Sequence, residues 1–280
     1  MARTAGMTPA AIRLLESLSA YRNLHATPGA VAAPVCHSHY RFTLEDRQVS
    51  VVSRIGPNGV DSSGRPNKLA HHLLLYPEER PQAGPLWLAA QEGLFADAWQ
   101  SPPCEYAEEP SVPVQREDPL QGGAWKKTTG DAGWAGVLAG RLMRSTPEPV
   151  VIVYDAGAPV LDLLREAAAL VPQRSRWRIS FSTYYARTPP GTDCLWRCCL
   201  RDSPAAREAG SSQRCTVIDL ADRRACQESD DWIRLAREGG TRVTETAGPG
   251  AEGGVVLMEN RKRKALRLKP VLRKGDGNDT

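Results

Sequence analysis

Five polar side chains that could bind a ligand or transfer protons lie close together in the stretch between residues 61 and 72. The group comprises Asp61, Arg65, Asn67, His71 and His72. Histidine titrates near neutral pH, so a histidine beside a carboxylate can serve as a general acid and base. Arginine and asparagine offer hydrogen-bond donors to a polar ligand. The stretch is therefore a candidate binding site, and an enzyme built on it would be hydrolase-like.

The same residues also have structural interpretations. Asp61 can cap a turn, Arg65 can form an ion pair, and His72 can be a core histidine bonded to a backbone carbonyl. Neighbouring side chains of a strand point to opposite faces, so His71 and His72 could not share a metal ion there, and the H-E-x-x-H spacing is absent. We predict no metal site in this stretch and assign it no catalytic residue.

Two regular elements must hold these side chains. The β-branched residues of 51–55 predict a strand that ends in a turn at residues 56–59, G-P-N-G. A polar loop at 61–67 then leads into residues 68–76, which fit either a helix or a strand. His72 falls on an apolar face in both cases.

A second cluster, residues 124–138, combines three glycines and two tryptophans with Asp131. The phosphate-loop pattern is not met, because no G-K-[ST] follows the glycines, and the G-x-x-G-x-x-G spacing is not that of a dinucleotide site. We expect Asp131 to cap a helix over 131–142 whose small residues permit close packing, with Trp125 and Trp134 as core anchors. We predict no cofactor. The seven cysteines contain no C-x-x-C pair and are expected to be free thiols.

The remaining pattern predicts an α/β fold, a mixed sheet with flanking helices and one β-α-β unit. Expected helices cover residues 8–21, 85–91, 159–170 and 230–237. Expected strands cover 37–44, 48–54, 149–154, 177–185, 194–200 and 215–220, with a loop between the last two. His37 and His39 share one face of the first of these strands. We expect an N-terminal domain at 1–122, whose last residues 101–122 form a linker, a second subdomain at 123–238, and a weakly ordered tail at 239–280.

Charge is distributed unevenly along the 280 residues. The net charge is +4, but the basic residues between Arg261 and Lys274 outnumber Asp276 and Asp279 by six, so residues 1–260 carry −2. We expect a solvated, partly disordered tail that attracts nucleic acid or an anionic surface weakly and without sequence preference. The sequence has no apolar run of about 20 residues and no signal-peptide pattern. We expect a cytoplasmic location.

The order of landmarks resembles a family. The matching stretches are ARTAGMTPAAIRLLESLSAYR, HSHYRF, VVSRIGPNGVDSSGRPNKLAHHLLL, TGDAGWAGVLA, WRISFSTYY and TVIDL. They are similar to the second type of N-terminal domain of the GTPase-associated protein of bacterial conflict systems, of the planctomycete type. The resemblance marks as family positions Asp61, Gly64, Arg65, Asn67, His71, His72, Gly130, Asp131, Gly133 and Trp134. Relatives begin with an additional strand before the A-R-T-x-G-M segment, and many continue past residue 280. We therefore expect a shortened gene product in which one sheet edge lacks its partner.

The resemblance implies a non-enzymatic adaptor or regulator that contacts a GTPase or another component of such a system. The alternative from the residues is a hydrolase-like enzyme that uses Asp61, Arg65, His71 and His72, together with Asp131. The enzyme hypothesis requires Asp131 to lie near the two histidines.

Overall fold

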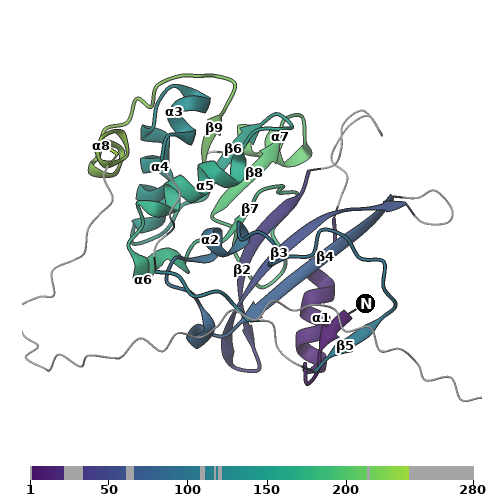
Figure 1. The fold of residues 1–280 in the computed structure, drawn as a ribbon. Helices are drawn as coiled ribbons and strands as arrows, with labels where there is room; N and C mark the ends of the chain where they lie inside the picture. The colour runs from purple at the N-terminus through teal and green to yellow at the C-terminus, as the bar shows by residue number, and fades with distance from the viewer. Residues whose placement is uncertain are drawn as a thin grey trace, which may run out of the picture. The chain divides into compact units, whose positions relative to one another are not determined.

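The computed structural model describes residues 2–21, 34–60, 66–107, 111–116, 118, 122–212 and 215–239. Its main feature is a seven-stranded mixed sheet with the order β4-β3-β2-β7-β8-β6-β9 (Figure 1). Three strands are antiparallel neighbours: β2 (Cys36–Leu44), β3 (Arg47–Val60) and β4 (Pro66–Leu75). Four run parallel to one another: β6 (Val150–Tyr154), β7 (Phe181–Ser182), β8 (Trp196–Leu200) and β9 (Thr216–Asp219). The antiparallel pair β2–β7 joins the two halves, and the predicted mixed α/β fold is confirmed.

The first hairpin forms as the sequence predicts. Leu44 pairs with Arg47, and the two residues between them, Glu45 and Asp46, have φ angles of 49° and 63°. Two consecutive left-handed residues make the tight turn that suits the twist of a hairpin, and a short acidic side chain such as aspartate tolerates that conformation.

The predicted turn at residues 56–59 is wrong, because β3 continues through it to Val60. The pairing with β2 ends at Ile55, so Pro57 borders only β4 and its missing N–H costs no hydrogen bond on the open side. The register shifts between Pro57 and Val60, which places a bulge there. The Asn58 side chain binds the backbone of Trp99. It donates to the Trp99 carbonyl and accepts from the Trp99 N–H, both at 3.0 Å.

Strand β4 resolves the choice between helix and strand for residues 68–76. It pairs with β3 from Pro66 to Leu75, and it lies at the edge of the sheet. Successive residues therefore point to opposite faces, so that His71 and His72 occupy different sides.

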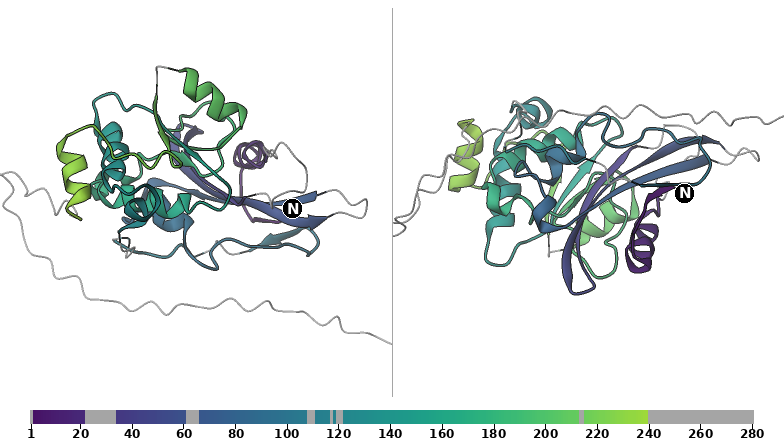
Figure 2. Two further views of the ribbon diagram at one scale, coloured as in Figure 1. Left: turned by 90° about the horizontal axis from the view of Figure 1, so that it is seen from above. Right: turned by 60° about the horizontal axis from the view of Figure 1, so that its bottom comes forward.

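Helix α1 (Pro9–Leu18) covers one face of the antiparallel strands (Figure 2). Thr8 caps it by accepting from the Ala11 N–H at 3.2 Å, and Pro9 occupies the first turn. Its leucines pack against Tyr40, Phe42, Val49 and Val51. The opposite face meets α2 (Pro85–Ala89), which follows a short 3₁₀ turn at Pro77–Glu79.

A separate two-stranded parallel sheet corrects one expectation. Its strands are β1 (Ala2–Thr4), which lies within the A-R-T-x-G-M segment before α1, and β5 (Cys104–Tyr106). Strand β5 lies inside residues 101–122, which the sequence suggested to be a linker without regular structure. The unpaired sheet edge stays a prediction.

Helices cover both faces of the parallel strands. They are α3 (Ala124–Thr129), α4 (Gly133–Met143), α5 (Val160–Ala169), α6 (Gln173–Arg176), α7 (Pro204–Ser211) and α8 (Asp231–Arg237). The β6 side chain of Ile152 shares a buried cluster with α5, whereas Val151 and Val153 share another with α7. The predicted β-α-β unit consists of β6, α5 and β7. Its two strands run parallel to each other, and β8 lies between them in the sheet.

Two further predictions in this region are wrong. The strand expected over 177–185 shrinks to Phe181–Ser182, because the N–H groups of Arg178 and Ile179 close the turn after α6 instead of entering the sheet. The loop expected before β9 contains α7, which Ser203 caps by accepting from the Ala206 N–H at 3.2 Å.

The predicted domain boundaries at residues 122 and 238 stay predictions. Strands from both sides of residue 122 join one seven-stranded sheet. No helix among the described residues is long and apolar enough to cross a membrane. In the same residues, all seven cysteines are free thiols, and Cys104 is exposed.

Candidate functional site

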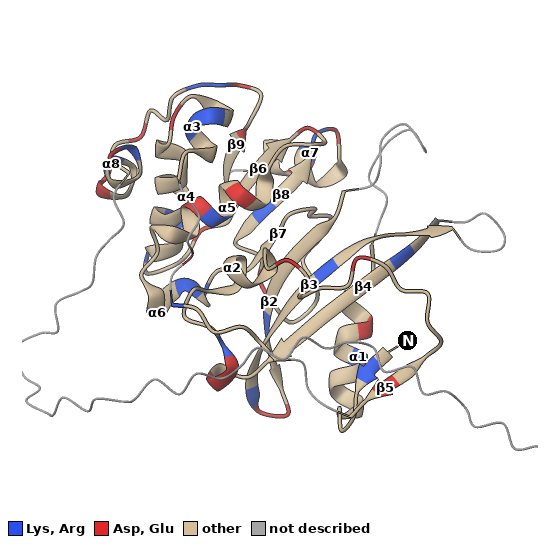
Figure 3. Cartoon of the chain, viewed as in Figure 1, with Lys and Arg blue, Asp and Glu red and all other residues tan. Residues whose placement is uncertain are grey.

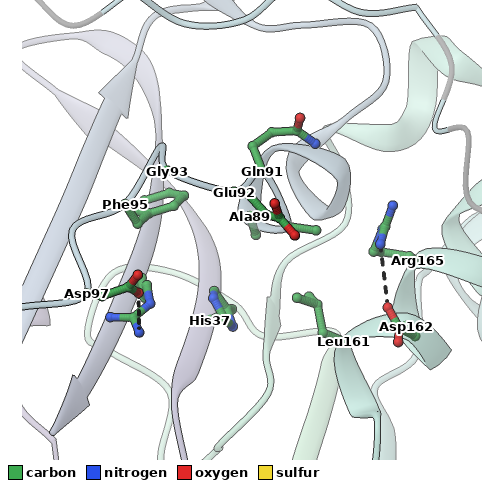
Figure 4. Close-up of a pocket in the computed structure, with 12 residues that line it drawn as sticks. His37, Ala89, Gln91, Glu92, Gly93, Phe95, Asp97, Leu161, Asp162 and Arg165 are labelled. Atoms are coloured by element: carbon green, nitrogen blue, oxygen red, sulfur yellow. Dashed lines mark hydrogen bonds and ion pairs between the residues drawn. The ribbon is translucent and has the colours of Figure 1, made fainter. Parts of the chain in front are cut away.

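A cavity of about 480 Å³ lies between the antiparallel strands and α5 (Figure 4). Strands β2 and β3 supply His37 and Arg54, and residues 89–97 form a second wall. Helix α5 supplies Leu161, Asp162 and Arg165. The His37 and Arg54 side chains lie together because these two residues are directly paired in the hairpin register.

One wall is fixed by Arg54. Its guanidinium group lies 2.7 Å from the carboxylate of Asp97 and donates to the Ala96 carbonyl at 3.1 Å. Only 15% of the Arg54 side chain is exposed, whereas 83% of that of Asp97 is. Arg54 therefore holds the segment from the inside, and Asp97 presents a carboxylate to solvent at the rim.

The facing wall is fixed by Arg165. Its Nε and Nη2 donate to the two carboxylate oxygens of Asp118 at 2.9 and 2.7 Å, and Nη1 lies 3.5 Å from Asp162. The two-pronged contact leaves little of the guanidinium charge unbalanced. Both cavity arginines are thus already committed to carboxylates.

His37 occupies the space between these walls. Burial and the neighbouring Arg54 lower the pKa of His37 to about 4, so its ring is neutral at physiological pH. Among the described residues its ring nitrogens have no hydrogen-bond partner. A neutral imidazole offers one donor and one acceptor, which suits the binding of a polar group better than proton transfer.

His71 positions a wall of the cavity from behind. The Ala96 N–H donates to His71 Nδ1 at 2.9 Å, and the Phe95 ring packs against the imidazole with a centroid separation of 5.4 Å. Burial and Arg54 lower the pKa of His71. This predicted site residue therefore shapes the candidate site without lining it.

His72 lies on the other face of β4 and ties α1 to the sheet. Its Nδ1 is 2.7 Å from the Ser53 hydroxyl, and its Nε2 is 3.0 Å from that of Ser19. Burial lowers the pKa of His72 to about 4. The partners are hydroxyl groups rather than the carbonyl that the structural interpretation expected, and both ring nitrogens are occupied.

Asp61 and Arg65 lie outside the described residues. Asn67 is exposed at the start of β4. None of the described residues forms a group of three His, Cys, Asp or Glu side chains that could hold a metal ion.

Asp131 fastens the C-terminal helix of the described chain. Its carboxylate accepts from the Gly133 N–H at 2.8 Å and from the Cys226 N–H at 2.9 Å, and it pairs with Arg237 at 2.7 Å. The predicted N-cap at Asp131 is wrong, because the helix begins at Gly133 with Ala132 at its N-cap, and Asp131 accepts from the first helical N–H from one residue further back. The hydrogen bonds with Arg237 are the main cause that lowers the pKa of Asp131 to about 2. Asp131 is therefore not suited to act as a base at neutral pH.

The two tryptophans of this cluster have different roles. Trp125 is fully buried and donates from its indole to the Leu163 carbonyl at 2.8 Å. Trp134 is partly buried and donates to the Arg224 carbonyl at 2.9 Å. Trp125 is a core anchor as predicted, whereas Trp134 packs at the edge of the core and holds the segment before α8.

The structure does not unite the predicted site residues. His71 borders the cavity, His72 contacts α1, and the Asp131 carboxylate bonds to Gly133, Cys226 and Arg237. Sequence reasoning missed Arg54, Asp97 and Arg165 as cavity residues. The hairpin register could have placed Arg54 beside His37, but no sequence signal pointed to Asp97 or Arg165.

Acid should destabilise the fold through His39. This residue is completely buried, with Nδ1 2.5 Å from the Ile179 carbonyl and Nε2 2.9 Å from the Ser50 hydroxyl, and burial lowers its pKa to about 3. Below pH ~6.5 the unfolded chain binds a proton at this position that the native chain does not bind, so His39 alone lowers stability by about 1.4 kcal/mol per pH unit down to its native pKa. His37 and His72, whose pKa values are lowered to about 4, add to the slope. Urea unfolding at pH 7.5, 6 and 5 measures the total slope. His39→Gln should reduce it by about 1.4 kcal/mol per pH unit, and an equal slope in that variant would contradict the assignment.

Taken together, the described residues form an α/β fold with a cavity that is lined in part by polar side chains. Two family models match the chain. Residues 1–113 match the N-terminal domain, type 2, of GTPase-associated protein 1, and residues 123–222 match the middle domain of GTPase-associated protein 1. The chain therefore belongs to the GTPase-associated protein 1 family. Neither the curated proteins nor the solved structures contain a match. The planctomycete affiliation stays a prediction.

Proposed function

We propose that the chain is a non-enzymatic adaptor or regulatory module of a GTPase-associated bacterial conflict system, and that it acts by protein–protein interaction. The observation that carries the proposal is the presence of two successive domains of GTPase-associated protein 1 in one chain. The proposed partner is the GTPase or another component of that system.

The protonation states of the candidate residues support binding over catalysis. Burial lowers the pKa values of His37 and His72 to about 4 and also lowers that of His71, and hydrogen bonds with Arg237 lower the pKa of Asp131 to about 2. A general base for neutral pH needs a pKa near 7. The alternative, a hydrolase-like enzyme using Asp61, Arg65, His71 and His72, would have to work with histidines whose hydrogen bonds already serve the fold.

The cavity is the contact surface that we favour. Its walls come from both matched segments, residues 37–97 from the N-terminal domain and residues 161–165 from the middle domain. A partner bound there would sense how the two domains are arranged. The exposed carboxylate of Asp97 at the rim offers an accessible charge for recognition.

Affinity purification of the tagged full chain from its native cells, washed at low and at moderate salt, tests the proposal. We expect mass spectrometry to identify a GTPase that is retained at moderate salt. Asp97→Lys should abolish retention, because it reverses the rim charge. Glu105→Lys is a matched control, since Glu105 is also exposed and paired with an arginine, Arg3, but lies outside the cavity. Equal retention by both variants would remove the cavity from the interface.

Two results would favour other functions. Turnover by the purified chain that disappears in His72→Ala, with folding intact, would establish the enzyme alternative. Recovery of nucleic acid alone, lost as the salt concentration rises, would instead point to residues Arg261–Lys274, which lie outside the described residues. Acidic and basic side chains are interspersed over the described elements, without a uniformly basic face in this view (Figure 3).

A further inference from the structure

The cavity beside His37 carries more negative than positive charge. Its lining contains three carboxylates and two guanidinium groups, those of Glu92, Asp97, Asp162, Arg54 and Arg165. The positive charge of Arg54 is balanced by Asp97 at 2.7 Å. Arg165 makes its two shortest contacts with a further carboxylate, that of Asp118. Both positive charges are thus neutralised within the protein, and the carboxylates of Glu92 and Asp162 are in excess.

These carboxylates have oxygens to spare for a ligand. Glu92 is exposed and has no ion pair within the described part of the chain. Asp162 is 49% exposed, and its contact with Arg165 Nη1 is 3.5 Å long, at the limit of a hydrogen bond. Asp97 uses one oxygen for Arg54 and is 83% exposed. A donor that enters the cavity can therefore bind them without displacing a short contact of the fold.

The acceptors belong to different walls of the cavity. Glu92 and Asp97 lie in the segment 89–97, whereas Asp162 lies in the first turn of α5. Figure 4 shows Asp97 and Asp162 on opposite sides of His37. The His37 ring adds a nitrogen acceptor that no other described residue occupies. A cation between these walls would meet acceptors from several directions.

Apolar side chains complete the lining. Ala89, Ala90 and Leu161 lie among the charged groups, and Leu161 is only partly buried. Arginine and lysine carry their charge at the end of an apolar stem, which packs well against such surfaces. The cavity volume of about 480 Å³ lies within the range of pockets that bury a ligand. The cavity therefore suits a long basic side chain.

We infer that the cavity binds an arginine side chain of the partner protein, with Glu92 and Asp162 accepting from its guanidinium group and Leu161 packing against its stem. A planar guanidinium group has five N–H donors and can meet carboxylates from two walls at once, whereas the lysine ammonium is a strongly hydrated point charge. Arginine is also enriched among the residues that dominate binding at interfaces. The inference rests on the proposed adaptor function for the source of the side chain.

NMR titration of the full chain with Nα-acetyl-arginine methylamide, at constant ionic strength, tests the inference. We expect saturable shifts of the backbone amide signals of residues 89–97. The corresponding citrulline compound, which has the same shape without the charge, should cause no saturable shift, and the lysine compound should bind more weakly than the arginine compound. Absence of saturable shifts with the arginine compound, or equal binding of the citrulline compound, would overturn the inference.

Substitution of the acceptors tests the same site from the protein side. Glu92→Gln should weaken binding of the arginine compound about threefold, and the double variant Glu92→Gln with Asp162→Asn about tenfold. Glu208→Gln is the matched control, because Glu208 on α7 is also exposed and lies outside the cavity. It should bind as the unchanged chain does. Glu92→Gln removes no ion pair, so its melting temperature should not change, and affinity equal to that of Glu208→Gln would refute the inference.

The inference and the proposed function can fail separately. A GTPase retained in the affinity purification, together with no binding of the arginine compound, would overturn the inference and leave the adaptor function standing. Binding of the arginine compound that depends on Glu92, without any retained protein partner, would uphold the chemistry inferred for the cavity and remove the proposed function.

Discussion

Asp131→Ala is expected to lower the free energy of unfolding by about 3 kcal/mol, because it leaves two buried N–H groups without acceptors and removes an ion pair. The N–H groups belong to Gly133 and Cys226, and Arg237 loses contacts of 2.9 and 2.7 Å at its Nε and Nη2. Only 10% of the Asp131 side chain is exposed, so water cannot easily replace it. Urea unfolding at pH 7 measures the change.

Two variants set the scale for that measurement. Arg237→Gln should cost less than Asp131→Ala, because the Arg237 side chain is 42% exposed and Asp131 keeps both backbone donors. Asp222→Ala removes an exposed carboxylate that lies 3.8 Å from Arg224, and it should change stability by less than about 0.5 kcal/mol. If Asp131→Ala were as mild as Asp222→Ala, Asp131 would not fasten the fold, and its place in a binding site would be open again.

Local pattern was sufficient for the elements whose interactions lie close in sequence. The hairpin of β2 and β3 follows from alternating apolar residues around Glu45 and Asp46, and α1 follows from the Thr8 cap and its leucine stripe. The errors arose where a distant partner decides the conformation. Pro57 is tolerated in β3 only because β2 has already ended, a fact that no local rule contains.

The candidate site shows the same limit. Types and spacing singled out His71 and His72, and strand geometry correctly kept them apart. Their roles depend on contacts with Ala96 and with Ser19, which are remote in sequence. Arg165 reaches the cavity only because α5 packs near the antiparallel strands, so its role could not be predicted from its neighbours in the chain.

The stretch T-G-D-A-G-W-A-G is one of the two sequence stretches that resemble the family most specifically. In this structure it anchors residues 224–237. Asp131 binds Arg237, Trp134 binds the Arg224 carbonyl, and a Cβ on Gly133 would lie 3.0 Å from the Ile233 side chain. Helix α8 lies beyond residue 222, where the match to the middle domain ends. The motif thus extends the middle domain by one helix and needs no catalytic explanation.

Gly136→Ala should destabilise the chain by about 2–3 kcal/mol, although alanine is the better helix former by about 1 kcal/mol. An added Cβ would lie 2.6 Å from both Cα and N of Ile233 and would also collide with the Trp232 carbonyl oxygen. These are backbone atoms of α8, which cannot turn aside as a flexible side chain can. Relief requires α8 to move away from α4, so the cost should fall on this helix contact.

Gly210→Ala supplies the control that isolates this contact. Gly210 also lies in a helix, α7, but an added Cβ would meet no atom within 4 Å. The helix-propensity gain then acts alone, and the variant should be more stable by roughly 0.5–1 kcal/mol. Opposite signs in urea unfolding for the same chemical change would show that close approach of α8, rather than a general preference of helices, requires glycine at position 136. Stabilisation by both substitutions would mean that α8 does not press against α4 in solution, and the fastening role assigned to Asp131 would fall with it.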